Sequence, residues 1–367
     1  MNIIKRPNHR AKTRSSKQPL GLLPKAGLAV AAVALGAVVL EGGARLLERN
    51  NIPAAYVGSP YYSATFEKEM RAAPGGWHTP VSSTLVVPNT YHGRWFNTQY
   101  GQRITFGQPN GAPHTVWLLG GSAVYNGEVP DAFTMASQLQ NLVNQNEATK
   151  GQWKVENLGA RGVHSAQELE RLKMVPLKQG DIVVFYDGAA DALHGVFYNN
   201  ATPAPAAFSW RSHLALARLL PAPSAAPAPA HLADAKQMTA ILDRTISTYG
   251  TNLDYAASFA RKHDARFVQV LQPMLFSQPT LSDAEKALAA NTALVPPGTE
   301  EALRAAYAQF KVALPSLAAM NGWEYADFSP ILNGTDEYYL NATDTTERAS
   351  ALVAGYLYKI LFRQPGA

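Results

Sequence analysis

One short apolar strand and the turn after it constrain the fold of this chain more than any other feature. The run 115–119 is apolar and of strand length, and Gly120-Gly121-Ser122 follows it at once. Glycine tolerates the backbone angles that a sharp strand-to-helix turn requires. Such a turn holds a serine hydroxyl at the carboxyl edge of a sheet, where open α/β folds bind their ligands. The sequence therefore makes Ser122 a candidate nucleophile.

The chain beyond this turn alternates predicted strands with predicted helices. We expect strands at 154–157, 182–186, 266–271 and 323–328, and helices at 134–146, 165–173, 232–262, 299–319 and 348–362. Ser165 is expected to cap its helix, with Glu168 three residues on. Strands that alternate with helices predict an α/β fold, in which a parallel sheet is covered by helices on both faces.

Composition supports a folded domain and argues against several classes of protein. Hydrophobic residues make up 47% of the 367 positions, enough for a full core, and charged residues only 16%, too few for a highly charged disordered chain. The formal charge of +5 does not indicate nucleic-acid binding, because the following basic residues stand before or at the start of the first apolar run: Lys5, Arg6, Arg10, Lys12, Arg14, Lys17 and Lys25. The chain has no cysteine, which excludes disulfides, thiolate metal sites and a cysteine nucleophile. We expect no cofactor and no metal.

The apolar run near the N-terminus has the length of a membrane-spanning helix. Residues 20–40 are apolar over a length close to the ~20 residues that a helix needs to cross a bilayer. The basic residues before it predict a cytoplasmic N-terminus and an exported remainder, as in a single-pass protein of the bacterial inner membrane. A cleaved signal peptide and a buried soluble helix are the alternatives; Glu41-Gly42-Gly43-Ala44 is a poor cleavage site.

These features predict four parts of the chain. Residues 1–19 form a cytoplasmic basic tail, 20–47 a transmembrane anchor, 48–110 a periplasmic lead-in, and 111–367 the α/β domain. The stretch 194–231 is expected to be an insertion in that domain, because it is rich in alanine and contains six prolines.

Three glycine-bearing segments and a fourth near the C-terminus resemble the sequence blocks of the SGNH (GDSL) hydrolase superfamily. The segments are Gly120–Ser122, Asn157–Gly162, Tyr186–Asp191 and Asn341–Ala354. The resemblance covers roughly residues 105–365, and the type most similar is that associated with bacterial exopolysaccharides, which has Gly-Gly-Ser in the first block. It implies a flavodoxin-like three-layer α/β/α sandwich preceded by one transmembrane helix.

The resemblance assigns roles to five positions. Ser122 matches the nucleophile and Gly162 the glycine whose N–H stabilises the oxyanion. Ala190 stands where the family has the asparagine that completes the oxyanion hole. Asn341 stands where the family has aspartate, and Asp344 where it has the histidine base. Three expected functional side chains are therefore changed.

The magnitudes of these losses favour a protein with impaired catalysis. Removing one oxyanion donor costs about 10²–10³ in rate, and a serine hydroxyl without a base is a weak nucleophile. Asp344 is a doubtful base, since a solvated carboxylate has a pKa of about 4, far below the ideal near neutrality. His164 and His194 follow the second and third blocks closely, and either one is a candidate replacement for the missing histidine.

Two functions remain open from the sequence. In the first, the fold is kept, the chemistry is lost, and the crevice binds a cell-surface polysaccharide, cellulose-like or acylated, or a partner in its synthesis and export. In the second, Ser122 is the nucleophile of an active esterase or O-acyltransferase that acts on acyl groups of such a polysaccharide. The involvement in polysaccharide synthesis is inferred from the resemblance, and the periplasmic location from the export signal.

Overall fold

The computed structural model describes residues 22–48, 65–66, 68–69, 90–198, 235–290, 299–334 and 336–362. Eight strands in this part of the chain form one sheet, in the order β1-β2-β3-β5-β4-β6-β7-β8. Five of them are parallel: β4 (His114–Gly120), β5 (Trp153–Asn157), β6 (Ile182–Asp187), β7 (Arg266–Leu271) and β8 (Glu324–Asp327). The five strands expected from the sequence are thus present, in the flavodoxin-like order of 2-1-3-4-5.

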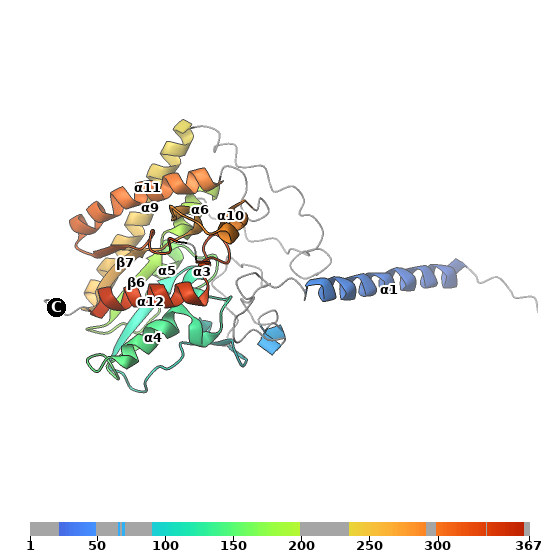
Figure 1. The fold of residues 1–367 in the computed structure, drawn as a ribbon, viewed down its shortest axis with the longest axis horizontal. Helices are drawn as coiled ribbons and strands as arrows, with labels where there is room; N and C mark the ends of the chain where they lie inside the picture. Colours follow the sequence, from blue (N-terminus) through green and yellow to red (C-terminus); the bar gives the residue numbers. More distant parts are fainter. Residues whose placement is uncertain are drawn as a thin grey trace, which may run out of the picture.

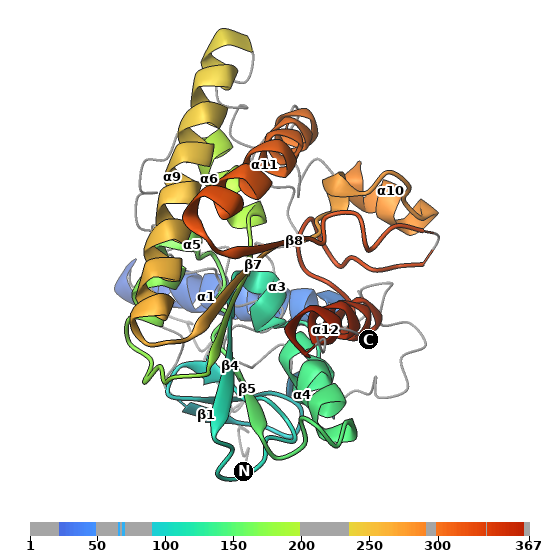
Figure 2. The ribbon, with the colours of Figure 1, turned by 90° about the vertical axis from the view of Figure 1, so that its left-hand side faces the viewer.

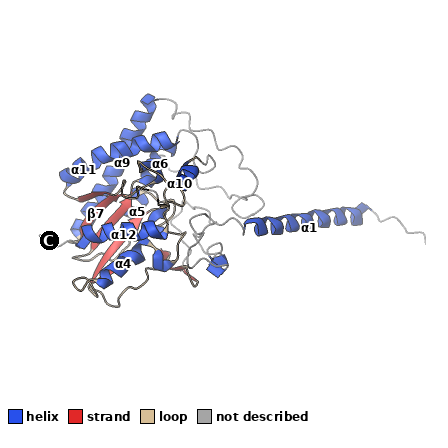
Figure 3. Ribbon diagram, viewed as in Figure 1, coloured by secondary structure: helices blue, strands red, loops and turns tan. Residues whose placement is uncertain are grey.

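Helices cover both faces of the sheet and give three layers (Figures 1 and 2). On one face α4 (Met135–Gln145) packs against α12 (Glu347–Phe362). The other face carries α5 (Ser165–Leu172), α6 (Ala189–Tyr198), α9 (Ala235–Lys262) and α11 (Thr299–Asn321). In Figure 3 the strands lie between these two helical layers. The α/β/α sandwich predicted from the alternation of elements is confirmed.

The central strands are buried on both faces and are mainly apolar. All six residues of β6 are buried, as expected of a parallel strand under helices on both faces. The helix α4 begins where Thr134, in an extended conformation, accepts a hydrogen bond from the Ser137 N–H at 3.2 Å. Such a cap satisfies one of the N–H groups that a helix leaves unpaired at its start.

The sheet begins before residue 111, where the α/β domain was expected to start. Three short strands of the expected lead-in join it: β1 (Thr90–His92), β2 (Asn97–Gln99) and β3 (Gln102–Arg103). They are antiparallel, and β3 pairs with β5 at Arg103 and Asn157. Part of the lead-in is therefore an extension of the same sheet.

The expected insertion at 194–231 also starts differently. The helix α6 continues to Tyr198, so the first five residues of that stretch are helical. The rest of it lies outside the described residues. Short elements complete the fold: α3 (Ser122–Tyr125), η2 (Asp131–Phe133), η4 (Leu275–Ser277) and α10 (Asp283–Ala289).

The prediction that Ser165 caps α5 is wrong. The N-cap is His164, whose backbone is extended and whose N–H donates to Gln167 Oε1 at 3.1 Å. Ser165 is the first helical residue, and its hydroxyl donates to Asp191 Oδ1 at 2.5 Å. Glu168, expected in a capping box, is buried against the sheet. A tertiary hydrogen bond takes Ser165, and burial takes Glu168, from the local role that sequence spacing suggests.

The N-terminal helix α1 (Leu22–Glu48) extends to one side of the α/β body (Figure 1). Several of its apolar side chains are exposed: Val30, Val33, Leu35, Val38, Val39, Leu40 and Leu46. Within the described residues, no helix combines the length and hydropathy expected of a bilayer-crossing segment.

Candidate functional site

Ser122 lies at the carboxyl edge of the sheet, as the sequence predicts. It is the first residue of α3 and follows β4, which lies between β5 and β6. The loop after β5 runs alongside, where the Leu158 N–H donates to the Leu118 carbonyl at 2.8 Å and the Ala160 N–H donates to the Gly120 carbonyl at 3.1 Å. The three glycine-bearing loops therefore share one rim, at the switch point where α/β sheets bind ligands.

Gly120 permits the sharp turn because its neighbours leave no room for a side chain. A Cβ at this position would overlap the Tyr186 carbonyl oxygen of β6 and the Val124 side chain of α3. At Gly121, a Cβ would lie 3.5 Å from the Val163 carbonyl oxygen of the loop after β5. The end of β6 and the loop after β5 thus contact the turn that presents Ser122 from either side.

The Ser122 hydroxyl contacts a threonine and not a base. Its one hydrogen-bond partner among the described residues is Thr343 Oγ1, at 3.3 Å. The threonine Oγ1 in turn lies 3.5 Å from Asn341 Oδ1. A hydroxyl has no capacity to take and keep the serine proton at neutral pH, so this contact does not activate the nucleophile.

The fourth block folds onto itself around Asn341. Its Oδ1 accepts from the N–H groups of Thr343, at 2.9 Å, and Asp344, at 2.8 Å. Its Nδ2 donates to Asp344 Oδ2 at 2.6 Å. Asp344 is only 2% exposed, and it makes no hydrogen bond to Ser122. Asn341 and Asp344 thus stabilise the loop that carries Thr343, and neither is placed as a base.

The three positions that the resemblance assigns to an oxyanion hole differ in the donors they offer. The N–H groups of Ser122 and Gly162 donate to no group in the described part of the structure, and Gly162 adopts a positive φ of 70°. Ala190, half-buried at the start of α6, offers a methyl group in place of a carboxamide. Two backbone N–H groups and no side-chain carboxamide are thus present at these positions.

The two candidate histidines pair with each other. The rings of His164 and His194 stack with their centroids 4.3 Å apart, and Ser122 has no hydrogen bond to either ring. Burial lowers the pKa of His164. Burial and the neighbouring His164 lower the pKa of His194, against an opposing effect of Asp191. The pair is therefore neutral at pH 7 and joins the start of α5 to α6.

A cluster of buried carboxyl groups beneath this rim was not predicted. Glu168 on α5, Asp187 at the end of β6 and Asp191 on α6 are all buried. Helical spacing already signals Glu168, because it shares one face of α5 with Ser165, Leu169 and Leu172, which are buried.

Two further side chains missed from the sequence hold the segment after α3. Arg103, 1% exposed, donates to Asp131 Oδ1 at 2.7 Å and to the carbonyls of Asn126 and Val129 at 2.5 Å each. Asn126 has a φ of 53°, and its carboxamide binds the Met135 N–H, the Ser350 hydroxyl and the Thr345 carbonyl. These contacts tie the serine turn to the loop that carries Thr343.

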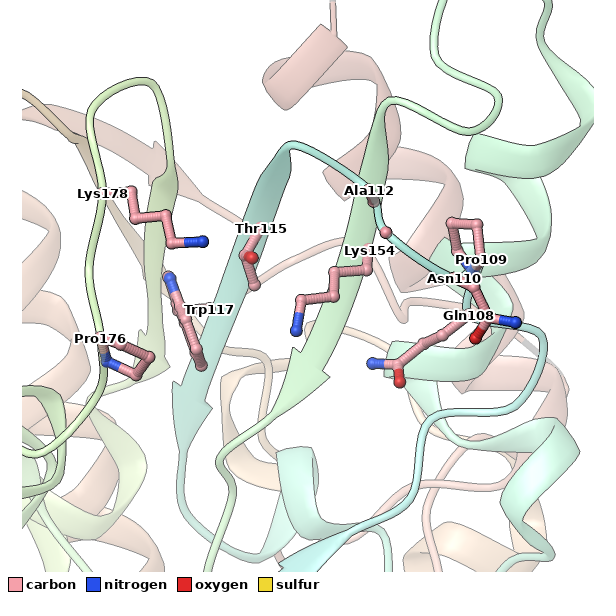
Figure 4. A pocket seen from close by; sticks show the side chains of 10 residues that line it. Gln108, Pro109, Asn110, Ala112, Thr115, Trp117, Lys154, Pro176 and Lys178 are labelled. Atoms are coloured by element: carbon pink, nitrogen blue, oxygen red, sulfur yellow. The ribbon is translucent and has the colours of Figure 1, made fainter.

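A separate hollow of about 420 Å³ lies near the opposite end of β4 (Figure 4). Lys154 and Lys178 approach Trp117 from two sides, with the Lys154 Nζ 5.9 Å from the centroid of the indole ring. Because Thr115 at the start of β4 also lines it, the hollow is not part of the rim around Ser122. Among the described residues, no group of three or more histidine, aspartate or glutamate side chains is placed to hold a metal ion.

Among known proteins, the chain is similar to several solved structures. No protein-family model matches the chain, and no curated protein matches it. A member of the lipolytic protein G-D-S-L family from Veillonella parvula shares 12% identity, with a TM-score of 0.39 over 68% of this chain and 100% of that one. A catalytic mutant of an acetylxylan esterase from Geobacillus stearothermophilus shares 11%, with a TM-score of 0.41 over 69% and 96%. The esterase EstA from Pseudoalteromonas shares 12%, with a TM-score of 0.36 over 67% and 96%. Similarities at this level carry no argument about function.

Proposed function

We propose that this chain is an SGNH-hydrolase-like protein that binds a cell-surface polysaccharide, or a partner in its synthesis and export, without turning it over. One observation carries the proposal: the Ser122 hydroxyl meets Thr343, while the imidazoles and the Asp344 carboxylate bind elsewhere. A site with its nucleophile, two backbone donors and no base lacks the means to cleave an ester.

The same proposal places the chain at the bacterial inner membrane. Residues 20–47 anchor it, the basic tail remains cytoplasmic, and the α/β domain lies in the periplasm. The charge pattern of residues 1–25 and the exposed apolar side chains of α1 support this placement.

Turnover and binding distinguish the proposed function from the active esterase or O-acyltransferase. The full chain is incubated with chromogenic acyl esters and with acetylated and unmodified cello-oligosaccharides. Acyl-Ser122 is sought by mass spectrometry, and glycan affinity is measured by calorimetry. We expect no acyl-enzyme, no turnover above the Ser122→Ala background, and glycan binding that Ser122→Ala leaves unchanged.

A bulky variant tests whether the rim is the binding surface. Ser122→Trp fills the space beside Thr343 and is expected to abolish glycan binding, whereas Ser258→Trp, on the exposed face of α9, is expected to retain it. Ester turnover that disappears in Ser122→Ala would establish the enzyme instead. Equal binding by both tryptophan variants would show that the glycan does not occupy this rim.

A further inference from the structure

The hollow near the start of β4 lies on a face of the sheet that the helices leave partly open. Side chains alternate between the two faces of a strand, and the Trp153 ring of β5 contacts Phe362 of α12, with the ring centroids 5.3 Å apart. Lys154, the next residue of β5, therefore points to the opposite face, which carries α5. No residue that lines the hollow belongs to α5, which has only eight residues, so the start of β4 and β5 is open on this face.

Two lysines bring positive charge to the hollow. Thr115 and Lys154 are register partners in the parallel pair of β4 and β5, so their side chains stand next to each other on one face of the sheet. Lys178 comes from the segment before β6, and in Figure 4 its ammonium group approaches Trp117 from the side opposite to Lys154. Among the described residues, no acidic side chain lines the hollow. Its wall therefore carries an excess of positive charge.

The two ammonium groups differ in their counter-ions. Lys154 Nζ pairs with Glu156 Oε1 at 2.7 Å, and the two side chains are 34% and 22% exposed. Lys178 is exposed, and its ammonium group makes no hydrogen bond or ion pair with any described residue. One cation at the hollow is thus shared with a carboxylate at its margin, and the other is available to an anion.

Asp181 fixes this wall from behind. Its carboxylate is 1% exposed and accepts from the Thr115 N–H at 2.8 Å, from Trp117 Nε1 at 2.9 Å and from the Lys178 N–H at 3.0 Å. Three N–H groups therefore stabilise its charge, and it does not line the hollow. The same three bonds hold the start of β4, the indole ring and the segment with Lys178 together, so the wall is organised before any ligand arrives.

A buried hydroxyl of the wall has no partner. Thr115 is 6% exposed, yet its Oγ1 makes no hydrogen bond with any described residue. In the view of Figure 4 it lies between the ammonium groups of Lys154 and Lys178. Gln108 offers a second polar atom, because its Nε2 donates to the Val155 carbonyl at 2.6 Å and its Oε1 has no partner in the described structure. Buried polar groups are nearly always hydrogen-bonded, so these atoms indicate where the polar groups of a ligand belong.

These groups define the chemistry of the ligand. Ammonium groups at a wall without a carboxylate favour an oxyanion, because charge-assisted hydrogen bonds to carboxylate or phosphate are the strong ones. The hydroxyl of Thr115 and the amide of Gln108 suit the hydroxyl groups of a sugar, and the exposed part of Trp117 adds an apolar contact. The volume of about 420 Å³ falls in the range of small-molecule sites, about 300–1,000 Å³, which suits a single sugar unit better than a long glycan.

We propose that this hollow is a binding site for an acidic sugar. Its carboxylate or phosphate lies between Lys178 and Lys154, and its hydroxyl groups meet Thr115 and Gln108. The site is at the end of the sheet opposite to Ser122, so the proposal does not rest on the function proposed for the rim around that serine.

Calorimetry on the full chain tests the ligand class with glucuronate, glucose 6-phosphate, glucose and inorganic phosphate. We expect both acidic sugars to bind and glucose to give no measurable heat. Inorganic phosphate is expected to bind about tenfold more weakly than glucose 6-phosphate, because it lacks the hydrogen bonds of the sugar hydroxyl groups. Affinity for the acidic sugars is expected to fall as the salt concentration rises from about 0.05 to about 0.5 M, since exposed charges are screened.

The decisive variant is Lys178→Gln, which removes the cation that has no counter-ion. We expect it to weaken binding of both acidic sugars by about tenfold or more, the loss of one charge-assisted hydrogen bond. Lys286→Gln is the matched control: it removes the same charge from α10, where the side chain is 63% exposed and pairs with Asp283. Its affinity for the acidic sugars is expected to equal that of the wild type. Both lysines are exposed, and circular dichroism checks that each variant is folded.

A resonance of the wall locates the ligand. The indole N–H of Trp117 is expected to shift in nitrogen–proton spectra of the full chain when glucuronate is added, and not when glucose is added. Shifts confined to the other five of the six tryptophans would place the binding elsewhere and overturn the proposal.

Three calorimetric results would also overturn it. They are glucose bound as tightly as the acidic sugars, an affinity for acidic sugars that Lys178→Gln leaves unchanged, and inorganic phosphate bound as tightly as glucose 6-phosphate. The last result would show that the hollow recognises the anion without the sugar.

Discussion

At the scale of single residues, the close packing of Gly120 determines the conformation of the turn before Ser122 more than hydrogen bonds do. Gly120 lies where strand β6 and helix α3 both contact the backbone, and Ser122 gains its exposure from that turn. Asn126 then closes the turn in a left-handed conformation, which asparagine tolerates better than most residues.

Substitution of Gly120 by alanine tests this packing. The added Cβ meets a backbone carbonyl, which is not free to move, so we expect a loss of roughly 1–3 kcal/mol in the free energy of unfolding. Denaturant titration measures it. Gly355→Ala in α12, where a Cβ meets nothing within 4 Å, should instead stabilise the protein by up to about 1 kcal/mol. Equal effects of the two substitutions would contradict the account.

At the scale of elements, a buried guanidinium is one of the contacts that attach the antiparallel strands β1–β3 to the α/β sandwich. Arg103 stacks 4.0 Å over the Phe96 ring, pairs with Asp131 and binds carbonyls of the segment after α3. A buried ion pair adds little net stability over an apolar pair, but removing one partner leaves the other charge uncompensated.

Arg103→Met is therefore expected to lower the free energy of unfolding by about 3–5 kcal/mol, because Asp131 remains buried and loses its cation. Arg348→Met is the control: its side chain is 68% exposed and pairs with Asp336 at the surface, so a change of at most about 1 kcal/mol is expected. Chemical denaturation of both variants gives the comparison. An Arg103→Met variant as stable as the control would show that other contacts hold these strands.

At the scale of the whole molecule, the α/β body and the N-terminal helix have different surfaces. The body buries a continuous core between its sheet and two helical layers, while α1 exposes apolar side chains along much of its length. An exposed apolar surface of this kind is unfavourable in water and indicates contact with a membrane or with another protein. We refer to whatever buries it as its cover.

A deletion tests whether that cover is a membrane. The full chain is expected to co-sediment with phospholipid vesicles, and a chain that lacks residues 1–48 is expected to stay in solution with its circular dichroism and unfolding midpoint retained. Substitution of the basic residues before position 20 by glutamine should reverse or scramble the orientation in a reporter fusion. Vesicle binding that survives the deletion would contradict an anchor in this segment.

Local pattern determined the fold of the body. Apolar runs such as 182–187 have the length of buried strands, their alternation with amphipathic helices favours a parallel three-layer sheet, and the glycines after β4 predict a serine at its rim. These properties depend on neighbouring residues, so the sequence alone specified the five parallel strands and the position of Ser122.

Only the tertiary structure decided what surrounds that serine. The contact of Ser122 with Thr343, the stacking of His164 on His194 and the hydrogen bond from Ser165 to Asp191 each join segments from different elements. Residue spacing carries no record of how such loops meet across a sheet, nor of burial, which moves a carboxyl or imidazole pKa. The sequence by itself thus determined where a site lies, and the packing of the loops decided which groups in it are able to react.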